Sequence, residues 1–163
     1  FMRIRTATQD DLDAICRVEA ICFPASEAGT RESFAARLKV FPRHFLLLED
    51  EGRLIGFVNG MVTDDRTISD VMFEQAELHK EDGKWQSVFG LDVLPEHRRK
   101  GNAGQLMRAL IEHSREDGRC GCILTCKEHL LPYYTRFGFR NLGVSLSQHG
   151  GAVWYDMILE FSR

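Results

Sequence analysis

The residues from 91 to 104 have the types and spacing that most directly suggest chemistry. An apolar, strand-like run leads into a turn that has three consecutive cationic residues and ends at Gly104, and the turn passes directly into an amphipathic helix. The first amides of a helix have no partner within the helix, and the helix dipole favours negative charge at that end. Small residues such as glycine and alanine let an anion approach the backbone closely. The pattern predicts a cradle for phosphate oxygens, with a tight turn carrying solvated basic residues as the alternative. The residues of this predicted cradle are Arg98, Arg99, Lys100, Gly101, Asn102, Ala103 and Gly104.

Two common nucleotide-binding motifs do not fit this stretch. The Walker phosphate loop needs four residues between its glycines and then Lys-Ser or Lys-Thr, and the dinucleotide motif G-x-G-x-x-G is absent as well. The predicted anion site therefore belongs to neither motif.

The second half of the chain supplies the elements that would hold this turn in place. Residues 85–93 have the pattern of a strand. Apolar residues recur on one face of the helix that follows the turn, and Gly118 can end that helix. The other elements predicted here are a short buried strand over 122–125, a brief helix over 133–137 with Pro132 in its first turn, and closing strands over 139–144 and 152–160.

The first half is predicted to complete an α/β fold. Thr8 and Asp11 have the spacing of a capping box before a first helix, and Thr30 can cap a second helix that Pro42 ends. The other predictions are a strand over 3–7, a hairpin over 44–49 and 53–58 with Gly52 in its turn, and a polar excursion over 63–84 with a short helical piece at 71–78. The order β-α-α-β-β-β-α-β-α-β-β predicts a mixed central sheet of about seven strands flanked by helices.

Length and composition restrict the class of protein. The 163 residues, of which 44% are apolar and 28% charged, suit one domain over residues 1–163. The net charge of −3 indicates no dense positive face for nucleic acid or a membrane surface. No apolar run reaches the ~18–20 residues of a bilayer span. We therefore expect neither a nucleic-acid nor a membrane partner.

The cysteines and the first residues bear on the cellular compartment. Residues 1–5 lack the apolar core of a signal peptide. The five cysteines are odd in number and lack metal-ligand spacing, and Cys120-Gly121-Cys122 is too tight for a CxxC pair. We expect reduced thiols, a cytoplasmic location and no bound metal.

The cradle and its surroundings resemble the GNAT acetyltransferase superfamily. Its signature, Arg/Gln-x-x-Gly-x-Gly/Ala between a strand and a helix, is matched by residues 98–103, RRKGNA. Leu91-Asp92-Val93 upstream and the aromatic-Tyr-x-x-x-Gly-Phe segment at 133–139 downstream fit as well. Within the superfamily the sequence is most similar to the serotonin (arylalkylamine) N-acetyltransferases. That similarity is carried by residues 126–139, CKEHLLPYYTRFGF, and 51–57, EGRLIGF.

The resemblance implies transfer of an acetyl group from acetyl-coenzyme A to a small primary amine, by direct attack of the amine. The pyrophosphate would lie on the amides of residues 99–104, and the pantetheine arm would pair with the backbone of Leu91, Asp92 and Val93 where two strands splay. A backbone N–H near Leu91 would stabilise the oxyanion. Tyr134 matches the tyrosine that protonates the departing thiolate, with a core anchor as the alternative role.

The proton acceptor departs from the arylalkylamine enzymes. Their pair of histidines is replaced here by Ser87 and Phe89, neither of which is a base with a near-neutral pKa. An amine with a pKa of ~10 is about one part in a thousand neutral at pH 7, so a proton must still be accepted. Water, His79, Glu74 and Glu77 are the candidates, and His79 is expected at the surface.

The acceptor pocket is expected between the first two helices, the excursion and the split strands. Phe89 and Thr125 are the predicted substrate-side residues, and both also suit a core position. The apolar walls would come from Phe23, Pro24, Phe34, Phe57, Met61 and Phe89. Two other functions stay open: a non-catalytic domain that binds acyl-coenzyme A, and acetylation of a protein or peptide amine. The resemblance also makes a homodimer an option.

Overall fold

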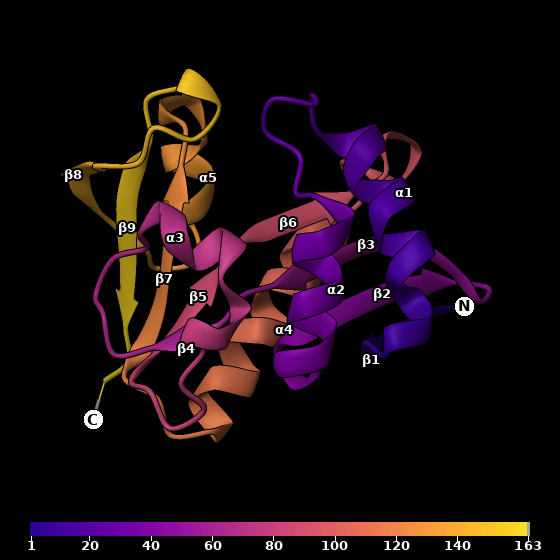
Figure 1. The fold of residues 1–163 in the computed structure, drawn as a ribbon, viewed down its shortest axis with the longest axis horizontal. Helices are drawn as coiled ribbons and strands as arrows, with labels where there is room; N and C mark the ends of the chain where they lie inside the picture. Colours follow the sequence, from indigo (N-terminus) through magenta and orange to yellow (C-terminus); the bar gives the residue numbers. More distant parts are fainter. Residues whose placement is uncertain (163) are drawn as a thin grey trace.

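The computed structural model describes residues 1–162 and contains two β-sheets side by side (Figure 1). The first sheet has the order β1-β2-β3-β6, with strands Met2–Thr6, Phe45–Asp50, Arg53–Asn59 and Gly90–Val93. The second has the order β4-β5-β7-β9-β8, with strands Val62–Thr63, Trp85–Val88, Gly121–Cys126, Tyr155–Glu160 and Arg140–Val144. The β5–β7 pair is parallel and the other pairs are antiparallel, which makes the sheets together mixed, as predicted.

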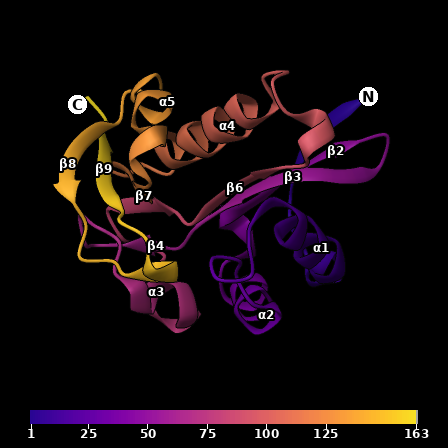
Figure 2. The ribbon, with the colours of Figure 1, turned by 90° about the horizontal axis from the view of Figure 1, so that it is seen from above.

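Helices cover both faces of the sheets (Figure 2). Helices α1, Leu12–Cys22, and α2, Arg31–Val40, lie on one face together with the short α3, Asp70–Glu74. Helices α4, Asn102–Glu116, and α5, Leu131–Thr135, lie on the opposite face. No helix in the described part of the chain is long and apolar enough to cross a bilayer.

Local sequence signals account for several of these boundaries. Thr8 and Asp11 form the predicted capping box, and the Thr30 hydroxyl accepts a hydrogen bond from the Ser33 N–H at 3.1 Å. In the hairpin turn, Glu51 and Gly52 both have positive φ, as a two-residue turn of type I′ requires. Such signals depend on neighbouring residues only, and so the sequence reveals them.

The predicted strand over 85–93 is wrong in one respect, because the chain breaks it at Phe89. Strand β5 joins the second sheet, whereas β6 pairs antiparallel with β3 of the first. The Phe89 N–H donates to the Asn59 carbonyl at 2.7 Å, where the chain crosses between the sheets. This break and the two-residue strand β4 raise the number of strands from about seven to the nine found in residues 1–162.

The break leaves one edge of β6 open. Among the described residues β6 pairs with β3 alone, and β7 takes its partners from the second sheet. The sheets therefore part between β6 and β7, where the resemblance expected two strands to splay. A cofactor arm can pair with such an edge as an added strand.

Candidate active site

The turn before α4 has the geometry predicted for an anion cradle. Gly101, the N-cap, has a φ of 82° and Arg99 has a φ of 62°, so the chain turns sharply there. The side-chain amide of Asn102 donates to the His97 carbonyl at 2.9 Å and fixes the turn. The amides of residues 99 to 104 have no acceptor within residues 1–162. They are free to bind an anion from outside the chain, and this role for them stays a prediction.

A basic cavity of about 1010 Å³ lies over this turn. It is lined by the turn, by one face of α4 and by the region of α5. Lys100 is exposed and does not line it. Three arginines that the sequence analysis did not select do line it, and the seven-residue spacing of Arg108 and Arg115 on α4 is the signal that could have found two of them. The five lining arginines are Arg98, Arg99, Arg108, Arg115 and Arg136.

A second cavity, of about 690 Å³, adjoins the first and extends between the sheets toward α1 and α2. Val93, Arg98, Ala103, Leu130 and Tyr133 line both cavities. A ligand that is long enough can therefore reach from the α4 turn to the interior.

The open edge of β6 lies along this route. The Leu94 N–H donates to the Ile55 carbonyl at 2.8 Å. Backbone groups of an antiparallel strand alternate in direction, so the amide of Asp92 also faces β3, and those of Leu91 and Val93 face the open edge. Of the three predicted contacts, Leu91 thus offers its backbone to a cofactor, and Val93 offers its N–H, because the Val93 carbonyl accepts from Arg98 and Cys22. Asp92 offers its side chain to the cavity instead.

Tyr134 lines the second cavity from α5. Burial raises the pKa of its phenol, and the nearby Cys126, Tyr133 and Asp92 raise it further. The hydroxyl is therefore protonated at neutral pH and can donate a proton, as the resemblance implies. Its role as the acid stays a proposal.

A cluster of buried charges lies at the inner end of the second cavity, and of its members the sequence analysis selected only Asp92. Asp92 and Arg37 are 1% and 4% exposed, and Glu19 of α1 is 8% exposed. The Arg37 guanidinium donates to the Asn59 side chain at 3.1 Å and to the Phe73 carbonyl at 2.9 Å. Burial lowers its pKa to about 10, against the charges of Glu19 and Asp92. Glu19 and Arg37 lie far from Asp92 in the sequence, and no local motif marks these two residues.

The walls of the second cavity agree with part of the sequence prediction. Phe89 and Thr125 line it, as do Phe23 and Phe34. Phe57 and Met61, predicted as walls, are fully buried in the core, and Pro24 does not line the cavity. Aromatic residues that the prediction omitted are Phe73, Tyr133, His149 and Trp154.

The three predicted bases lie in different places. Glu74 is exposed and lines the cavity, whereas Glu77 lies outside it. The expectation that His79 lies at the surface is wrong, because its side chain is 5% exposed. It packs on Phe41, with 5.1 Å between ring centroids, and so is withdrawn from the cavity.

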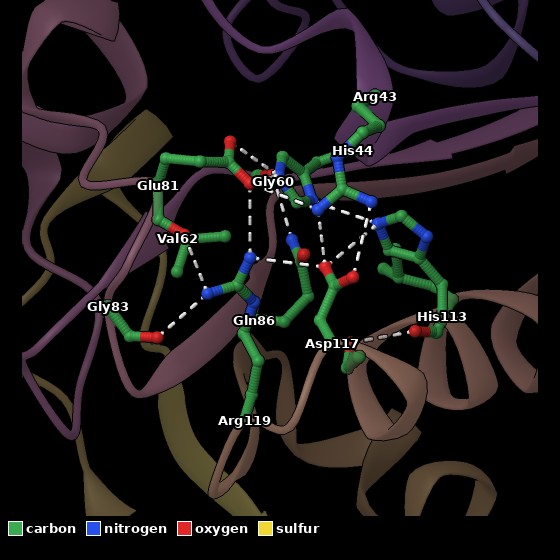
Figure 3. A network of polar contacts seen from close by, with 12 residues as sticks. Arg43, His44, Gly60, Val62, Glu81, Gly83, Gln86, His113, Asp117 and Arg119 are labelled. Carbon is green, nitrogen blue, oxygen red and sulfur yellow. Dashed lines mark hydrogen bonds and ion pairs between the residues drawn. The ribbon is translucent and has the colours of Figure 1, made fainter.

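His79 instead belongs to a polar network at another place in the molecule, the histidine network. Figure 3 shows its members Arg43, His44, Glu81, His113, Asp117 and Arg119. The His79 Nε2 and His44 Nε2 atoms lie 2.9 and 3.0 Å from Glu81, and His113 Nε2 lies 3.0 Å from His44 Nδ1. Arg43 and Arg119 each contact both Glu81 and Asp117.

The spacing of this histidine network would admit a cation, but its donors do not fit one. Two groups are close enough to share an ion: His44 with His79 and Glu81, and His44 with His113 and Asp117. His79 Nδ1 accepts the Val62 N–H at 2.9 Å, so neutral His79 carries its proton on Nε2, the atom that faces Glu81. The two arginines beside the carboxylates oppose a cation as well.

Comparison with known proteins places this geometry in context. The acetyltransferase (GNAT) family matches residues 12–139. The chain is 26% identical over 162 residues to serotonin N-acetyltransferase of Mesocricetus auratus, an alignment that covers 94% of this chain and 74% of that protein.

Solved structures share the fold. The loading GNATL domain of CurA from Lyngbya majuscula has a TM-score of 0.84 at 14% identity, with 98% of each chain covered. The GphF GNAT-like decarboxylase in complex with isobutyryl-CoA has a TM-score of 0.80 at 20% identity, with 97% of this chain and 98% of that chain covered.

Proposed function

The chain belongs to the acetyltransferase (GNAT) family, and from that membership we propose that it transfers the acetyl group of acetyl-coenzyme A to a small primary amine with an apolar or aromatic body. One observation carries the proposal. A basic cavity built on unpaired amides adjoins a second cavity that has aromatic walls, Tyr134 and buried carboxyl groups. The first suits a diphosphate and the second suits an amine.

The coenzyme would lie along both cavities. Its diphosphate would accept hydrogen bonds from the amides of residues 99–104, with the five lining arginines supplying positive charge. Its pantetheine arm would pair with the open edge of β6 at Leu91 and Val93. The thioester would then lie in the second cavity, near Tyr134.

The transfer needs one nucleophile, one oxyanion donor and one acid. The neutral amine attacks the carbonyl carbon, so that a C–N bond forms and the C–S bond breaks. The Leu91 N–H, on the open edge, donates to the carbonyl oxygen as its negative charge grows. Tyr134 gives its proton to the departing sulfur, and the phenolate takes the proton that the acylated nitrogen loses.

The residues that line the second cavity also indicate the chemical class of the acceptor. Five of its lining residues are carboxylic acids: Glu19, Glu27, Asp70, Glu74 and Asp92. Its aromatic walls include Phe73 and Phe89, with ring centroids 4.6 Å apart. Carboxylates attract an ammonium group and aromatic rings take an apolar body, which together describe an alkyl- or arylalkylamine.

The test is acetyl transfer from labelled acetyl-coenzyme A to a panel of arylalkylamines, alkylamines and short peptides. We expect transfer to arylalkylamines and a loss of about 100-fold in kcat for Tyr134→Phe, the usual scale for one acid group, with unchanged coenzyme binding. Tyr155→Phe is the matched control, since Tyr155 lies outside both cavities and donates to Glu128.

Two other outcomes of this assay would favour the alternative functions. Tight binding of acetyl-coenzyme A without transfer to any acceptor would favour a non-catalytic acyl-coenzyme A domain. Transfer to the peptides alone would favour a protein substrate.

A further inference from the structure

Asp92 carries a carboxyl group that the fold buries without a partner. It is 1% exposed, and neither oxygen has a hydrogen-bond partner among the residues that the structure describes. The side chain lines the second cavity from β6. Buried polar groups are nearly always hydrogen-bonded, and therefore an exception at a cavity wall calls for a functional explanation.

Glu19 of α1 meets Asp92 across the end of this cavity. Its Oε2 accepts the Gly29 N–H at 2.8 Å, and its carboxyl group lies beside that of Asp92 and also lines the second cavity. Two adjacent buried carboxyl groups cannot both ionise, so they hold a proton between them. The Gly29 N–H donates to Glu19, whereas no donor reaches either oxygen of Asp92, so the geometry places the shared proton on Asp92.

The pKa of Asp92 agrees with this placement. Burial raises it well above its ordinary value, and the adjacent carboxyl group of Glu19 raises it further. The other titratable or charged groups that face Asp92 are Cys22 of α1, Arg37 of α2, Arg98 of the cradle and Tyr134 of α5.

The neighbouring cations donate no hydrogen bond to Asp92, although the charge of Arg98 opposes the rise of its pKa. Arg37 donates to Asn59 and Phe73, and Arg98 Nε donates to the Val93 carbonyl at 2.8 Å. The Asp92 carboxyl therefore remains available to a molecule in the cavity.

Resting on the proposed function, we propose that Asp92 and Glu19 form the proton relay that activates the acceptor amine. The ammonium group of the acceptor gives one proton to the free oxygen of Asp92, while the proton already on Asp92 passes to Glu19. The amine becomes neutral and keeps its lone pair, and the carboxyl pair changes from one negative charge to none. This proton transfer removes the positive charge of the ammonium group and the negative charge of the carboxyl pair from a low-dielectric cavity, where such charges are costly.

The relay takes the role that the sequence leaves unassigned. Ser87 cannot supply it, because its hydroxyl is buried and donates to the Met61 carbonyl at 2.6 Å. Phe89 has no basic atom, and His79 is held in the histidine network. Asp92 and Glu19 come from β6 and α1, on the face where the second cavity opens.

The relay is tested with Asp92→Asn and Glu19→Gln, which keep side-chain size and remove the acid. The acceptors are phenethylamine, an ammonium ion at pH 7, and an aniline, which is already neutral. For phenethylamine we expect kcat/KM at pH 7 to fall at least about 100-fold in both variants, and for the aniline less than about tenfold. Glu77→Gln is the control, because it removes the same charge outside both cavities.

Further readouts separate a relay from a structural role. With phenethylamine, log kcat/KM of both variants should keep rising with unit slope toward the pKa of the amine, whereas wild type levels off earlier. Infrared spectra at pH 7 should show a protonated carboxyl band in wild type that Asp92→Asn abolishes. Calorimetry with acetyl-coenzyme A should give equal affinities for wild type and both variants.

The outcomes distinguish the relay from the proposed function. Wild-type rates and pH profiles in both variants would overturn the relay while acetyl transfer by wild type still supports the proposed function. If wild type binds the coenzyme but acetylates no amine, the proposed function fails and the relay fails with it, and a carboxyl band that persists would then show only the shared proton.

Discussion

At the scale of single residues, the unpartnered Asp92 carboxyl should lower the stability of the fold. Its folded-state pKa lies above the ordinary value of about 4, so the fold favours the protonated form. Any stabilisation by that proton is complete below pH ~4 and is lost as the pH rises through the folded pKa. At neutral pH the buried acid therefore costs stability that a neutral amide does not.

We accordingly predict that Asp92→Asn raises the thermal midpoint at pH 7 by a few degrees while it lowers activity. The stability difference between variant and wild type should shrink as the pH falls toward 4. Urea unfolding followed across this pH range measures it. An Asp92→Asn protein that is less stable than wild type at pH 7 would show that the carboxylate is a structural partner.

The arginines over the cradle allow a separate prediction at this scale. A Cβ placed on Gly104 would lie 3.1 Å from a guanidinium nitrogen of Arg108, so this side chain lies beside the free amides. Losing one charge-assisted hydrogen bond to a phosphate costs roughly 1.5–3 kcal/mol. Arg108→Ala should weaken coenzyme A binding by about tenfold or more, and less in high salt.

Calorimetry at two salt concentrations tests this prediction. Arg17→Ala removes the same charge from an exposed position on α1 outside both cavities and serves as the control. Equal affinity of Arg108→Ala and Arg17→Ala would remove Arg108 from the phosphate site.

The sequence predicts the residues of the site unequally. The cradle at 98–104 is a local pattern, in which backbone geometry follows from neighbouring glycines and a helix start, and so it was found. The Asp92–Glu19 pair was not, because its members come together only when α1 packs beside β6. Glu19 is a polar residue in the apolar stripe of α1, which is a signal of burial but does not identify a partner.

At the scale of elements, the crossing between the sheets depends on Gly60. A Cβ there would lie 1.9 Å from the Ser87 carbonyl oxygen, closer than any side chain can approach. The backbone of the β3–β4 corner therefore packs directly on β5, and the Gln86 amide donates to the Gly60 carbonyl at 2.8 Å (Figure 3). Only glycine allows this contact.

We predict that Gly60→Ala lowers the free energy of unfolding by about 3 kcal/mol, the upper part of the usual range for overpacking. Gly118→Ala is the control. It has a φ of 78° with open space around it, so it should cost only the strain of that conformation, about 1 kcal/mol. Urea unfolding of the two variants tests this prediction. Equal losses in the free energy of unfolding would mean that the backbone around residue 60 can move to accommodate the added methyl group.

The elements were predicted better than their pairing. Capping residues precede α1 and α2, and α4 follows the positive-φ Gly101 and carries an apolar stripe, so these boundaries follow from local signals. The break at Phe89 has no such signal, because residues 85–93 form one continuous strand-like run. The run is split because its first half pairs with β7 and its second half pairs with β3. The short α5 begins at Leu131, two residues before the predicted start, because Pro132 suits its first turn.

At the scale of the whole molecule, the histidine network joins segments of both sheets. His44 precedes β2 of the first sheet, Glu81 and His79 precede β5 of the second, and His113 and Asp117 lie at the end of α4. These contacts fasten the sheets together away from the two cavities. That residues 1–163 form one domain, that the protein is a homodimer and that it is cytoplasmic stay predictions.

The network should make the stability of the whole molecule depend on pH. Burial lowers the pKa of His44 to about 4, below its ordinary value of 6.5, and burial also lowers the pKa of His113. Between pH 6.5 and 4, therefore, His44 is protonated in the unfolded chain but stays neutral in the native fold. Stability should fall as the pH falls through this window, by about 3 kcal/mol at most from His44, at ~1.4 kcal/mol per pH unit.

We predict that His44→Gln flattens this pH dependence by about one proton, because glutamine does not titrate, while its removal of contacts to Glu81 and His113 lowers stability at pH 7. His129→Gln is the matched control, since His129 is exposed. Below pH ~4.5 a second loss should appear in all three proteins, because hydrogen bonds from His79, Arg43 and His44 lower the pKa of Glu81 to about 2 although burial opposes them. Urea unfolding at half-unit steps from pH ~7.5 to ~2.5 measures the slopes of both losses. Parallel curves for wild type and His44→Gln would mean that His44 titrates alike in the folded and unfolded chain, and that other groups set the acid sensitivity of the fold.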